Sequence, residues 1–310
     1  MHTFNNQKRY VTLSDTFKHR FGKKVFKVPL DGGFTCPNKD GVKGTGGCIY
    51  CSPSGSGDFT AGKTMDLKHQ FETIKQRMEN KWPDAYTMPY FQANTNTYAP
   101  VDTLRAMFEE AMYFDESVVA IAIATRCDAL GEDVLDLLES LNRKKPIQLE
   151  IGLQTIHEKS ASFINRGHDL YCFDSALKAL RKRGIEVVVH IINGLPGEDE
   201  KDMLATIDHL NTLDIQGLKI HMLHVMKKTA LARIYKKEPF HMLTLKEYIS
   251  ITVKQIEKLN PKVVIHRLSG DAPKDTLIAP LWTLKKFVVM NEIDKLLRKK
   301  DTYQGIYFNK

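Results

Sequence analysis

Three cysteines in one glycine-rich loop are the residues of this chain best suited to chemistry. Cys36, Cys48 and Cys51 lie in the segment CPNKDGVKGTGGCIYC, with eleven residues between the first two and two between the last two. Iron–sulfur clusters usually take four thiolates, and the other cysteines, Cys127 and Cys172, lie far along the chain. The loop is therefore predicted to hold three corners of an iron–sulfur cube and to leave one iron open for another ligand.

A structural zinc site is the main alternative for this loop, because zinc also favours a C-x2-C pair. A closed zinc site needs four ligands, and residues 32–68 contain no histidine, so a distant residue would have to complete it. Ordinary buried thiols fit poorly, since four glycines lie between Cys36 and Cys48 and indicate turns. The odd count of five cysteines, with no signal-peptide pattern at the start of the chain, disfavours a disulfide framework.

The length of 310 residues is enough for one large α/β domain. The longest clear apolar run, VVAIAIA at residues 118–124, is far shorter than the ~18 residues that a membrane-spanning helix needs. We therefore expect a soluble cytoplasmic protein without a membrane partner, whose thiols are reduced and available to metal.

Positive charge is concentrated at the two ends of the chain, whose net charge is +8. Residues 1–30 carry seven Lys or Arg against one Asp, and residues 282–310 carry seven against three acidic residues. Aromatic residues lie among these charges: Phe4, Tyr10, Phe17, Phe21 and Phe26 early, and Trp282, Phe287, Tyr303 and Tyr307 late. Because cations bind phosphates and aromatic rings stack on unpaired bases, RNA is a candidate partner. A solvated face with aromatic residues in the core is the alternative.

Short apolar runs alternate with amphipathic stretches along the chain. The runs predict strands at residues 25–29, 88–93, 118–124, 147–153, 185–192, 216–222 and 262–268. The amphipathic stretches predict helices near residues 67–78, 104–111, 134–141, 172–183, 199–213, 244–259 and 280–300. This alternation indicates a parallel sheet of βα units, and the expected fold class is α/β with a partial βα barrel.

In a βα barrel, reactive residues gather at the carboxyl ends of the strands. The cysteine loop follows the first predicted strand, and polar residues lie at or beyond the ends of later ones: Asn94, Asn96, Thr125, Arg126, Glu150, Gln154, His190 and Asn193. We expect these side chains on one concave face beside the loop. Each of them alone has an ordinary explanation as a cap or a satisfied core polar group.

The loop resembles the cluster loop of radical SAM enzymes in its stretched form. Followed by SPSGSGDF, it is similar to the catalytic domain of the Elongator-type tRNA acetyltransferases. Four later segments resemble those that line the barrel in radical SAM proteins of the YhcC/YtqA type (MnmL-like): FQANTNTYAP, ATRCDAL, LEIGLQTIHEKSASFINRGHD and HIINGLPGE. The resemblance extends from about Tyr10 to Gly305, almost the whole chain.

The resemblance implies one [4Fe–4S] cluster on Cys36, Cys48 and Cys51, with S-adenosylmethionine at the open iron. Cleavage of S-adenosylmethionine would give a 5′-deoxyadenosyl radical, and a reductant such as flavodoxin or ferredoxin would supply the electrons. Tyr50 and Asn193 would lie near adenine, Asn94 near the methionyl end, and Thr125 and Glu150 near the ribose or amino group. The expected cofactor-binding set also includes Gln154 and Arg166, the latter for the cofactor carboxylate or a substrate anion.

The Elongator-like loop implies that the substrate is the C5 side chain of a tRNA wobble uridine. The implied reaction converts carboxymethylaminomethyl toward aminomethyl, and the implied partner is the anticodon loop of tRNA. A radical SAM enzyme acting on a small molecule or a protein is one alternative, and a zinc-stabilised RNA-binding module is another. The expected organisation is one continuous domain: a basic N-terminal extension at 1–23, the radical SAM partial barrel at 24–268 and a C-terminal helical extension at 269–310.

Two further sets of residues have weaker signals. Cys127 follows Arg126 at a strand end and is a candidate hydrogen donor or acceptor, with a packed core thiol as the alternative. Cys127 and Cys172 are too few for a second four-cysteine cluster. His221 and His224 stand three residues apart, which on an extended strand points them to opposite faces, so no second metal site is predicted there.

Overall fold

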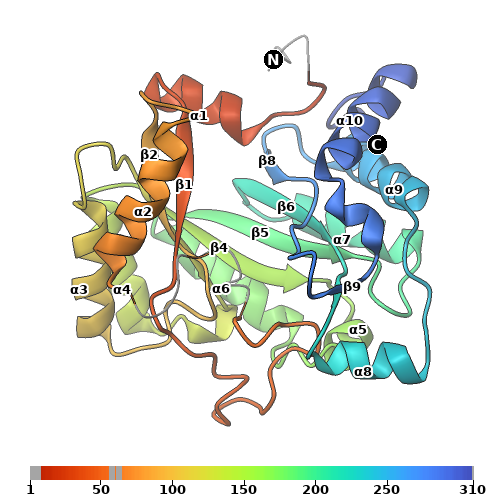
Figure 1. Cartoon of the computed structure of the whole chain (residues 1–310), viewed down its shortest axis with the longest axis horizontal. Coiled ribbons are helices and arrows are strands. Elements are labelled where there is room, and N and C mark those ends of the chain that lie inside the picture. The colour runs from red at the N-terminus through yellow and green to blue at the C-terminus, as the bar shows by residue number, and fades with distance from the viewer. Residues whose placement is uncertain (1–7, 56–59, 61–64, 309–310) are drawn as a thin grey trace.

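Seven parallel strands form one sheet in the order of the sequence (Figure 1). They are β1 (Val25–Leu30), β2 (Tyr86–Phe91), β3 (Ile121–Thr125), β4 (Ile147–Gln154), β5 (Glu186–Asn193), β6 (Gly217–Met222) and β8 (Val264–Arg267). This computed structural model describes residues 8–55, 60 and 65–308, so Phe4 and part of the SPSGSGDF segment lie outside it. The sheet curls into a half-barrel, which confirms the predicted fold class.

Helices cover the outer face of the sheet between successive strands. They are α2 (Leu67–Glu79), α3 (Val101–Met112), α4 (Glu132–Asn142), α6 (Leu170–Lys182), α7 (Glu200–Asn211) and α9 (Leu245–Lys258). Local sequence fixes where several of them begin: Asp199 with Asp202, and Thr244 with Glu247, form reciprocal capping boxes at the starts of α7 and α9. The predicted alternation of strands and helices is confirmed.

The central strands present different residues to the two sides of the sheet. Leu149 and Ile151 of β4 are buried in the main hydrophobic core, with Val187 and Val189 of β5. The alternate positions carry polar side chains, such as Glu150 and His190, and these line a cavity on the inner side. Since successive residues of a strand point to opposite faces, the curl of the sheet gathers these polar groups together.

Several elements and boundaries differ from the sequence prediction. Three short helices, α1 (Leu13–Phe21), α5 (Glu158–Phe163) and α8 (Ala230–Lys237), were not predicted, nor was the antiparallel pair β7 (Val225–Met226) and β9 (Leu277–Ala279). Strand β9 lies in the segment that we expected to be helical. The final helix, α10 (Lys286–Lys299), begins later than expected because a 3-10 turn, Leu281–Leu284, follows Pro280.

The segment before α1 joins the two ends of the described chain at the outer edge of β8. Thr12 forms a parallel bridge with Ile265, whose N–H donates to the Val11 carbonyl at 2.9 Å. Gln304 accepts a hydrogen bond from the Val11 N–H at 2.9 Å and donates its own N–H to Arg9. Within residues 8–55, 60 and 65–308, no helix is long and apolar enough to span a membrane.

Candidate functional site

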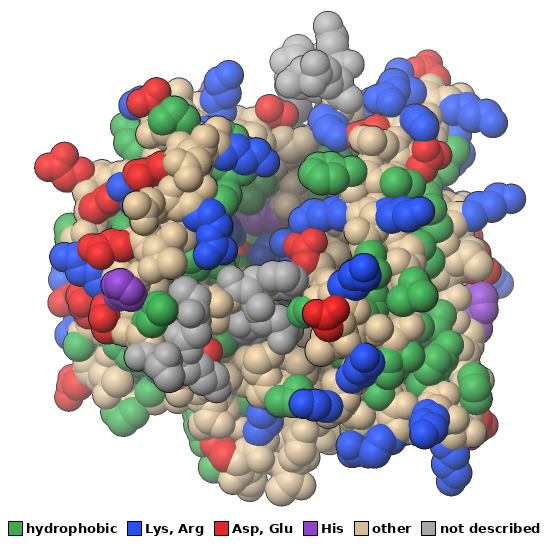
Figure 2. All heavy atoms as spheres, in the orientation of Figure 1, with side chains coloured by type: hydrophobic (Ala, Val, Ile, Leu, Met, Phe, Trp, Pro, Cys, Tyr) green, Lys and Arg blue, Asp and Glu red, His purple; other side chains and the backbone are tan. Residues whose placement is uncertain are grey.

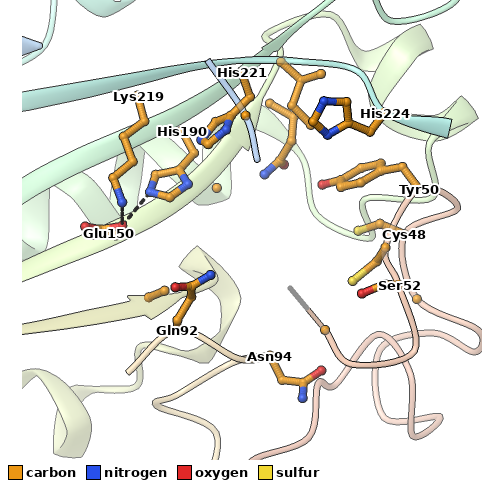
Figure 3. A pocket seen from close by; sticks show the side chains of 18 of the residues that line it. Cys48, Tyr50, Ser52, Gln92, Asn94, Glu150, His190, Lys219, His221 and His224 are labelled. Atoms are coloured by element: carbon orange, nitrogen blue, oxygen red, sulfur yellow. Dashed lines mark hydrogen bonds and ion pairs between the residues drawn. The ribbon is translucent and has the colours of Figure 1, made fainter. Parts of the chain in front are cut away.

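A cavity of about 340 Å³ opens at the carboxyl ends of the strands. Figure 2 shows it as a hollow with a histidine inside. The structure brings most of the predicted residues together there: its lining includes Cys36, Cys48, Cys51, Tyr50, Asn94, Thr125, Glu150 and Gln154. In Figure 3, Cys48, Tyr50 and Ser52 on the loop face Glu150, His190 and Lys219 on the strands. Arg166 and Asn193 are not among the lining residues.

The cysteine loop is fastened to the segment that follows α5. Asn38 donates its side-chain N–H to the Asn165 carbonyl at 2.6 Å, and Asn165 donates to the Gly47 carbonyl at 2.8 Å. The Ile49 N–H donates to the Ile164 carbonyl at 3.0 Å. These contacts fix the backbone on both sides of Cys48, so the segment after α5 helps to set the shape of the loop.

The three loop sulfurs are spaced more widely than the ligands of a single zinc ion. Ligands around one tetrahedral zinc ion lie roughly 3.8 Å apart. Among the described residues, the only three thiol, imidazole or carboxylate ligand atoms within 4.8 Å of one another belong to Cys127, His168 and Cys172. At least one pair of loop sulfurs therefore lies more than 4.8 Å apart. The assignment of the three loop thiolates to an iron–sulfur cluster stays a prediction.

Asn94 and Gln154 both adopt a left-handed backbone at the carboxyl ends of β2 and β4, with φ of 59° and 63°. Such a backbone is uncommon outside glycine and is found at binding sites. Asn94 accepts from Lys39 Nζ at 3.0 Å, and its N–H donates to the Gly55 carbonyl at 2.8 Å. A Cβ at Gly55 would lie 1.9 Å from Asn94 Oδ1, so this contact between the loop and the strand end needs glycine.

Tyr50 and Thr125 line the cavity and also have structural contacts. Tyr50 packs against a small apolar cluster that includes Leu223 and Leu231, and burial raises the pKa of its hydroxyl well above the usual range. The Thr125 hydroxyl lies 2.6 Å from that of Thr97. The roles predicted for these two residues at the cofactor stay predictions.

Arg166, Asn193 and Asn96 find partners inside the protein. Arg166 is 1% exposed and donates to the Leu153 and Thr155 carbonyls at 2.8 and 2.6 Å. Asn193 exchanges side-chain hydrogen bonds with Gln255 at 2.8 and 2.9 Å. Asn96 donates to two backbone carbonyls. These contacts favour a structural role for the three side chains, and the cofactor contacts predicted for Arg166 and Asn193 have no support from the cavity.

Glu150 is the centre of a buried polar network. Its Oε1 accepts from Lys27 Nζ at 2.5 Å. Its Oε2 accepts from Lys219 Nζ at 2.5 Å, from the Tyr90 hydroxyl at 2.6 Å and from His190 Nε2 at 2.7 Å. A carboxylate offers about four lone-pair sites, two on each oxygen, so three donors crowd Oε2 while Oε1 has one donor. The predicted contact of Glu150 with the cofactor stays a prediction.

The network sets the charge of the inner wall. Burial would raise the pKa of the Glu150 carboxyl, but Lys219 and Lys27, with the hydrogen bond from His190, hold it well below its usual range. Burial lowers the pKa of Lys219 to about 7, although Glu150 opposes that shift. Burial and then Lys219 lower the pKa of His190 to about 4, so this ring is neutral and donates one N–H.

Three cavity residues near the carboxyl end of β6 and β8 were not predicted as site residues: His221, His224 and Arg267. The prediction that His221 and His224 point to opposite faces is wrong: β6 ends at Met222, before His224, and both side chains line the same cavity. Of the described polar atoms, Nε2 of each histidine is buried and has no hydrogen-bond partner. A ligand in the cavity would therefore find two open ring nitrogens.

Cys127 is 4% exposed and is not among the lining residues. Its sulfur lies 3.2 Å from that of Cys172. This burial supports a packed thiol rather than direct contact with a substrate, and the hydrogen donor role stays a prediction.

The basic N-terminal segment is mostly engaged within the protein. Four of its seven cations form ion pairs: Lys8 with Asp294, Arg9 with Asp301, Arg20 with Glu186 and Lys27 with Glu150. Tyr10, Phe17 and Phe26 are buried, as the core alternative expected. Helix α1 also lies at the opposite end of β1 from the cysteine loop (Figure 1). These residues are poorly suited to contact RNA at the cavity.

Unlike the N-terminal segment, the segment from β9 to α10 leaves many of its apolar side chains exposed. It exposes a row of apolar side chains, of which Phe287 is 80% exposed and Leu281 62%. Lys286 pairs at 2.9 Å with Asp271, which lines the cavity. Lys and Arg side chains also spread over this side of the molecule in Figure 2. Trp282, in contrast, donates to the Leu243 carbonyl at 2.9 Å and packs on Tyr248.

Comparison with known families and structures agrees with the fold. The profile described as Radical SAM superfamily matches residues 41–210, and that described as Radical_SAM C-terminal domain matches residues 215–299. Uncharacterized protein YtqA of Bacillus subtilis is 46% identical over 99% of this chain and 95% of its own length. The tRNA uridine(34) acetyltransferase of Methanocaldococcus jannaschii is 28% identical over 55% of this chain and 32% of its own.

One solved structure supports the fold. The archaeal Methanocaldococcus infernus Elp3, lacking its N-terminal residues, superposes with a TM-score of 0.69 at 17% sequence identity. The superposition covers 90% of this chain and 64% of that one. The shared architecture includes the half-barrel and extends over nearly the whole chain.

Proposed function

The chain belongs to the radical SAM superfamily, whose members use a [4Fe–4S] cluster and S-adenosylmethionine, and we propose that it modifies the C5 side chain of a tRNA wobble uridine. Cys36, Cys48 and Cys51 would hold the cluster, which when bound supplies the electron that cleaves S-adenosylmethionine. Tyr50, Asn94, Thr125 and Gln154 would position that cofactor. The observation that carries the proposal is that these residues share one cavity with Lys219, Arg267 and two histidines of the inner wall.

The inner wall suits a substrate that ends in a carboxylate. Lys219 and Arg267 line the cavity, where they pair with Glu150 and Asp271, and His221 and His224 offer open ring nitrogens. A carboxymethylaminomethyl group ends in one carboxylate, and side chains of these types form hydrogen bonds with carboxylates. We therefore propose conversion of this group toward aminomethyl. The bond between the amino nitrogen and the carboxymethyl carbon breaks and the two-carbon unit leaves, with its carboxylate held at the strand wall and the loop beside the reacting carbon.

The tRNA part of the proposal is tested by comparing the nucleosides of bulk tRNA, by mass spectrometry, from cells with and without this gene. We expect cells lacking the gene to lose aminomethyl-type wobble uridines and to accumulate the carboxymethylaminomethyl form. A gene encoding Cys48→Ala serves as the matched control and should fail to restore the modification.

Unchanged wobble uridines would refute the tRNA substrate but leave the radical chemistry intact. In that case, 5′-deoxyadenosine formed by the reduced protein with S-adenosylmethionine would favour the alternative, a small-molecule or protein substrate.

Phe287 is proposed to stack on an unpaired base of the anticodon loop. Its ring is exposed beside Lys286, which reaches the rim of the cavity through Asp271. Because stacking contributes about 1–3 kcal/mol per base, Phe287→Ala should weaken tRNA binding by roughly 5- to 150-fold. Fluorescence anisotropy with labelled tRNA measures this loss, and binding should also weaken steeply as salt rises.

Tyr113→Ala is the matched control for this experiment. Tyr113 is also an exposed aromatic residue with a lysine, Lys145, over its ring, but it lies at the end of α3. The control should bind tRNA as well as the unchanged protein does. Equal affinities of all three proteins would show that Phe287 of α10 does not contact the RNA.

A further inference from the structure

A second group of side chains of the types that bind metals lies outside the cysteine loop, at the edge of the cavity, which His168 lines. Cys127 lies in the 3-10 turn after β3 (Cys127–Ala129), and Cys172 lies in the first turn of α6. Their sulfur atoms are 3.2 Å apart. A ring nitrogen of His168 completes a set in which all three ligand atoms lie within 4.8 Å of one another.

We propose that Cys127, His168 and Cys172 form a binding site for Zn²⁺. Two thiolates and one imidazole are ligands that zinc favours, and in a tetrahedral site the sulfur and nitrogen atoms lie roughly 3.5–3.8 Å apart. The observed separations need only small side-chain adjustments to reach that arrangement. Three protein ligands leave a fourth position, which water fills.

Local structure holds each ligand in place. Asp169 begins α6 and accepts from the Cys172 N–H at 2.8 Å, which fixes the distance between His168 and Cys172 along the chain. The Asp169 carbonyl lies 3.2 Å from His168 Nδ1. A donor N–H at Nδ1 leaves the lone pair on Nε2, and metal-bound histidines commonly have such a backbone partner. The Thr97 hydroxyl donates to the Ala129 carbonyl at 2.6 Å and anchors the turn that carries Cys127.

The charges around the site also suit a divalent ion. Two thiolates balance one Zn²⁺, so the loaded site has no net charge and can lie in a largely buried place. The nearby Arg126 guanidinium is already neutralised by two hydrogen bonds to Asp128, at 2.9 and 2.8 Å. Arg126 also donates to the Arg166 carbonyl at 2.8 Å, so it ties this site to the segment that carries His168.

A disulfide between the two cysteines is the competing interpretation, because the sulfurs are already close. It would not explain the imidazole, which stands within ligand distance of both. A zinc ion would instead connect the end of β3 to α6 beneath Arg126. This site is independent of the function proposed above, since it uses none of the loop thiols.

Cobalt serves as the probe, because Co²⁺ takes zinc sites and absorbs light when thiolates bind it. The test uses the full chain carrying Cys36→Ser, Cys48→Ser and Cys51→Ser, in which Cys127 and Cys172 are the remaining cysteines. Titration under argon with a non-thiol reductant should give one thiolate-bound Co²⁺ per chain, with tetrahedral visible bands. Equimolar Zn²⁺ should bleach those bands.

Additional Cys172→Ser should abolish the thiolate absorption, and additional His168→Gln should weaken Co²⁺ binding at least tenfold, in line with losing one of three ligands. Additional His157→Gln, a histidine outside the site, should change nothing. Circular dichroism and thermal unfolding show whether each variant is folded. A folded, reduced parent chain that takes up no thiolate-bound Co²⁺ would overturn the proposal, as would absorption that persists in Cys172→Ser.

Discussion

Cys48→Ala is expected to give a colourless protein that no longer cleaves S-adenosylmethionine. The side chain lies between Cys36 and Cys51 in the loop and lines the cavity with both. Its removal leaves two thiolates where a cluster needs at least three from the protein. After anaerobic purification and reconstitution with iron and sulfide, iron content and 5′-deoxyadenosine formation should both fall to background.

Ser54→Ala is the control, since Ser54 lies in the same loop and its hydroxyl bonds to that of Ser52 at 2.8 Å. This variant should keep the cluster and the cleavage. Iron and cleavage retained by Cys48→Ala would contradict the ligand assignment. Stoichiometric zinc in place of iron in the unchanged protein would instead favour a zinc-stabilised RNA-binding module.

Glu150→Gln should strongly destabilise the fold. The substitution keeps the shape of the side chain but removes its charge, which leaves Lys27 and Lys219 without their carboxylate partner. Glu150 is 1% exposed, and breaking a buried ion pair by removing one partner costs about 3–5 kcal/mol. Denaturation in urea, followed by circular dichroism, measures the free energy of unfolding.

Glu186→Gln provides the same chemical change in an exposed ion pair, with Arg20 at 2.6 Å. Its cost should stay below about 1 kcal/mol. Adding Lys219→Met to Glu150→Gln should restore part of the stability, because the unpaired ammonium is removed. Equal effects of the two glutamine variants would show that the buried network contributes no more than a surface pair.

The stability difference between the unchanged protein and Glu150→Gln also has an expected pH dependence. Glu150 has a lowered pKa in the folded protein, so the folded state binds fewer protons than the unfolded state as the pH falls past the unfolded pKa of about 4.3. The contribution of Glu150 is therefore complete at neutral pH and is lost in acid. Lys219 has a pKa of about 7 in the folded protein and about 10.4 in the unfolded chain, so unfolding takes up a proton between these pH values. The contribution of Lys219 to the free energy of unfolding therefore rises with pH in that window.

The loop and the strand ends could be predicted because their signals are local. The three loop cysteines lie within one short segment, so their spacing is visible in the sequence. The alternation of strands and helices places Asn94, Thr125 and Gln154 at the same end of the sheet. All three lie in the cavity. The small elements β7 and β9 were missed because two or three residues carry no recognisable period.

The partners of a buried side chain could not be predicted in the same way. Glu150 meets Lys27, Tyr90 and Lys219, which come from three other strands and are set by the register of the sheet. Arg166 has the charge to bind a carboxylate, but backbone carbonyls surround it in the folded chain. The shared orientation of His221 and His224 depends on where β6 ends, which hydrophobic pattern alone locates only to within a few residues.

The contact of Val11 with Gln304 has a consequence for folding during synthesis. The sheet can grow strand by strand as the chain emerges, because each strand pairs with the one made before it. Val11 and Gln304, by contrast, are 293 positions apart and meet beside the edge of β8. Val11 and Thr12 are made early, but they can pair with this edge only after β8 has been made, and Gln304 then holds Val11 in place. Because contacts between distant parts of a chain form slowly, closure of this edge is expected to be a late step of folding.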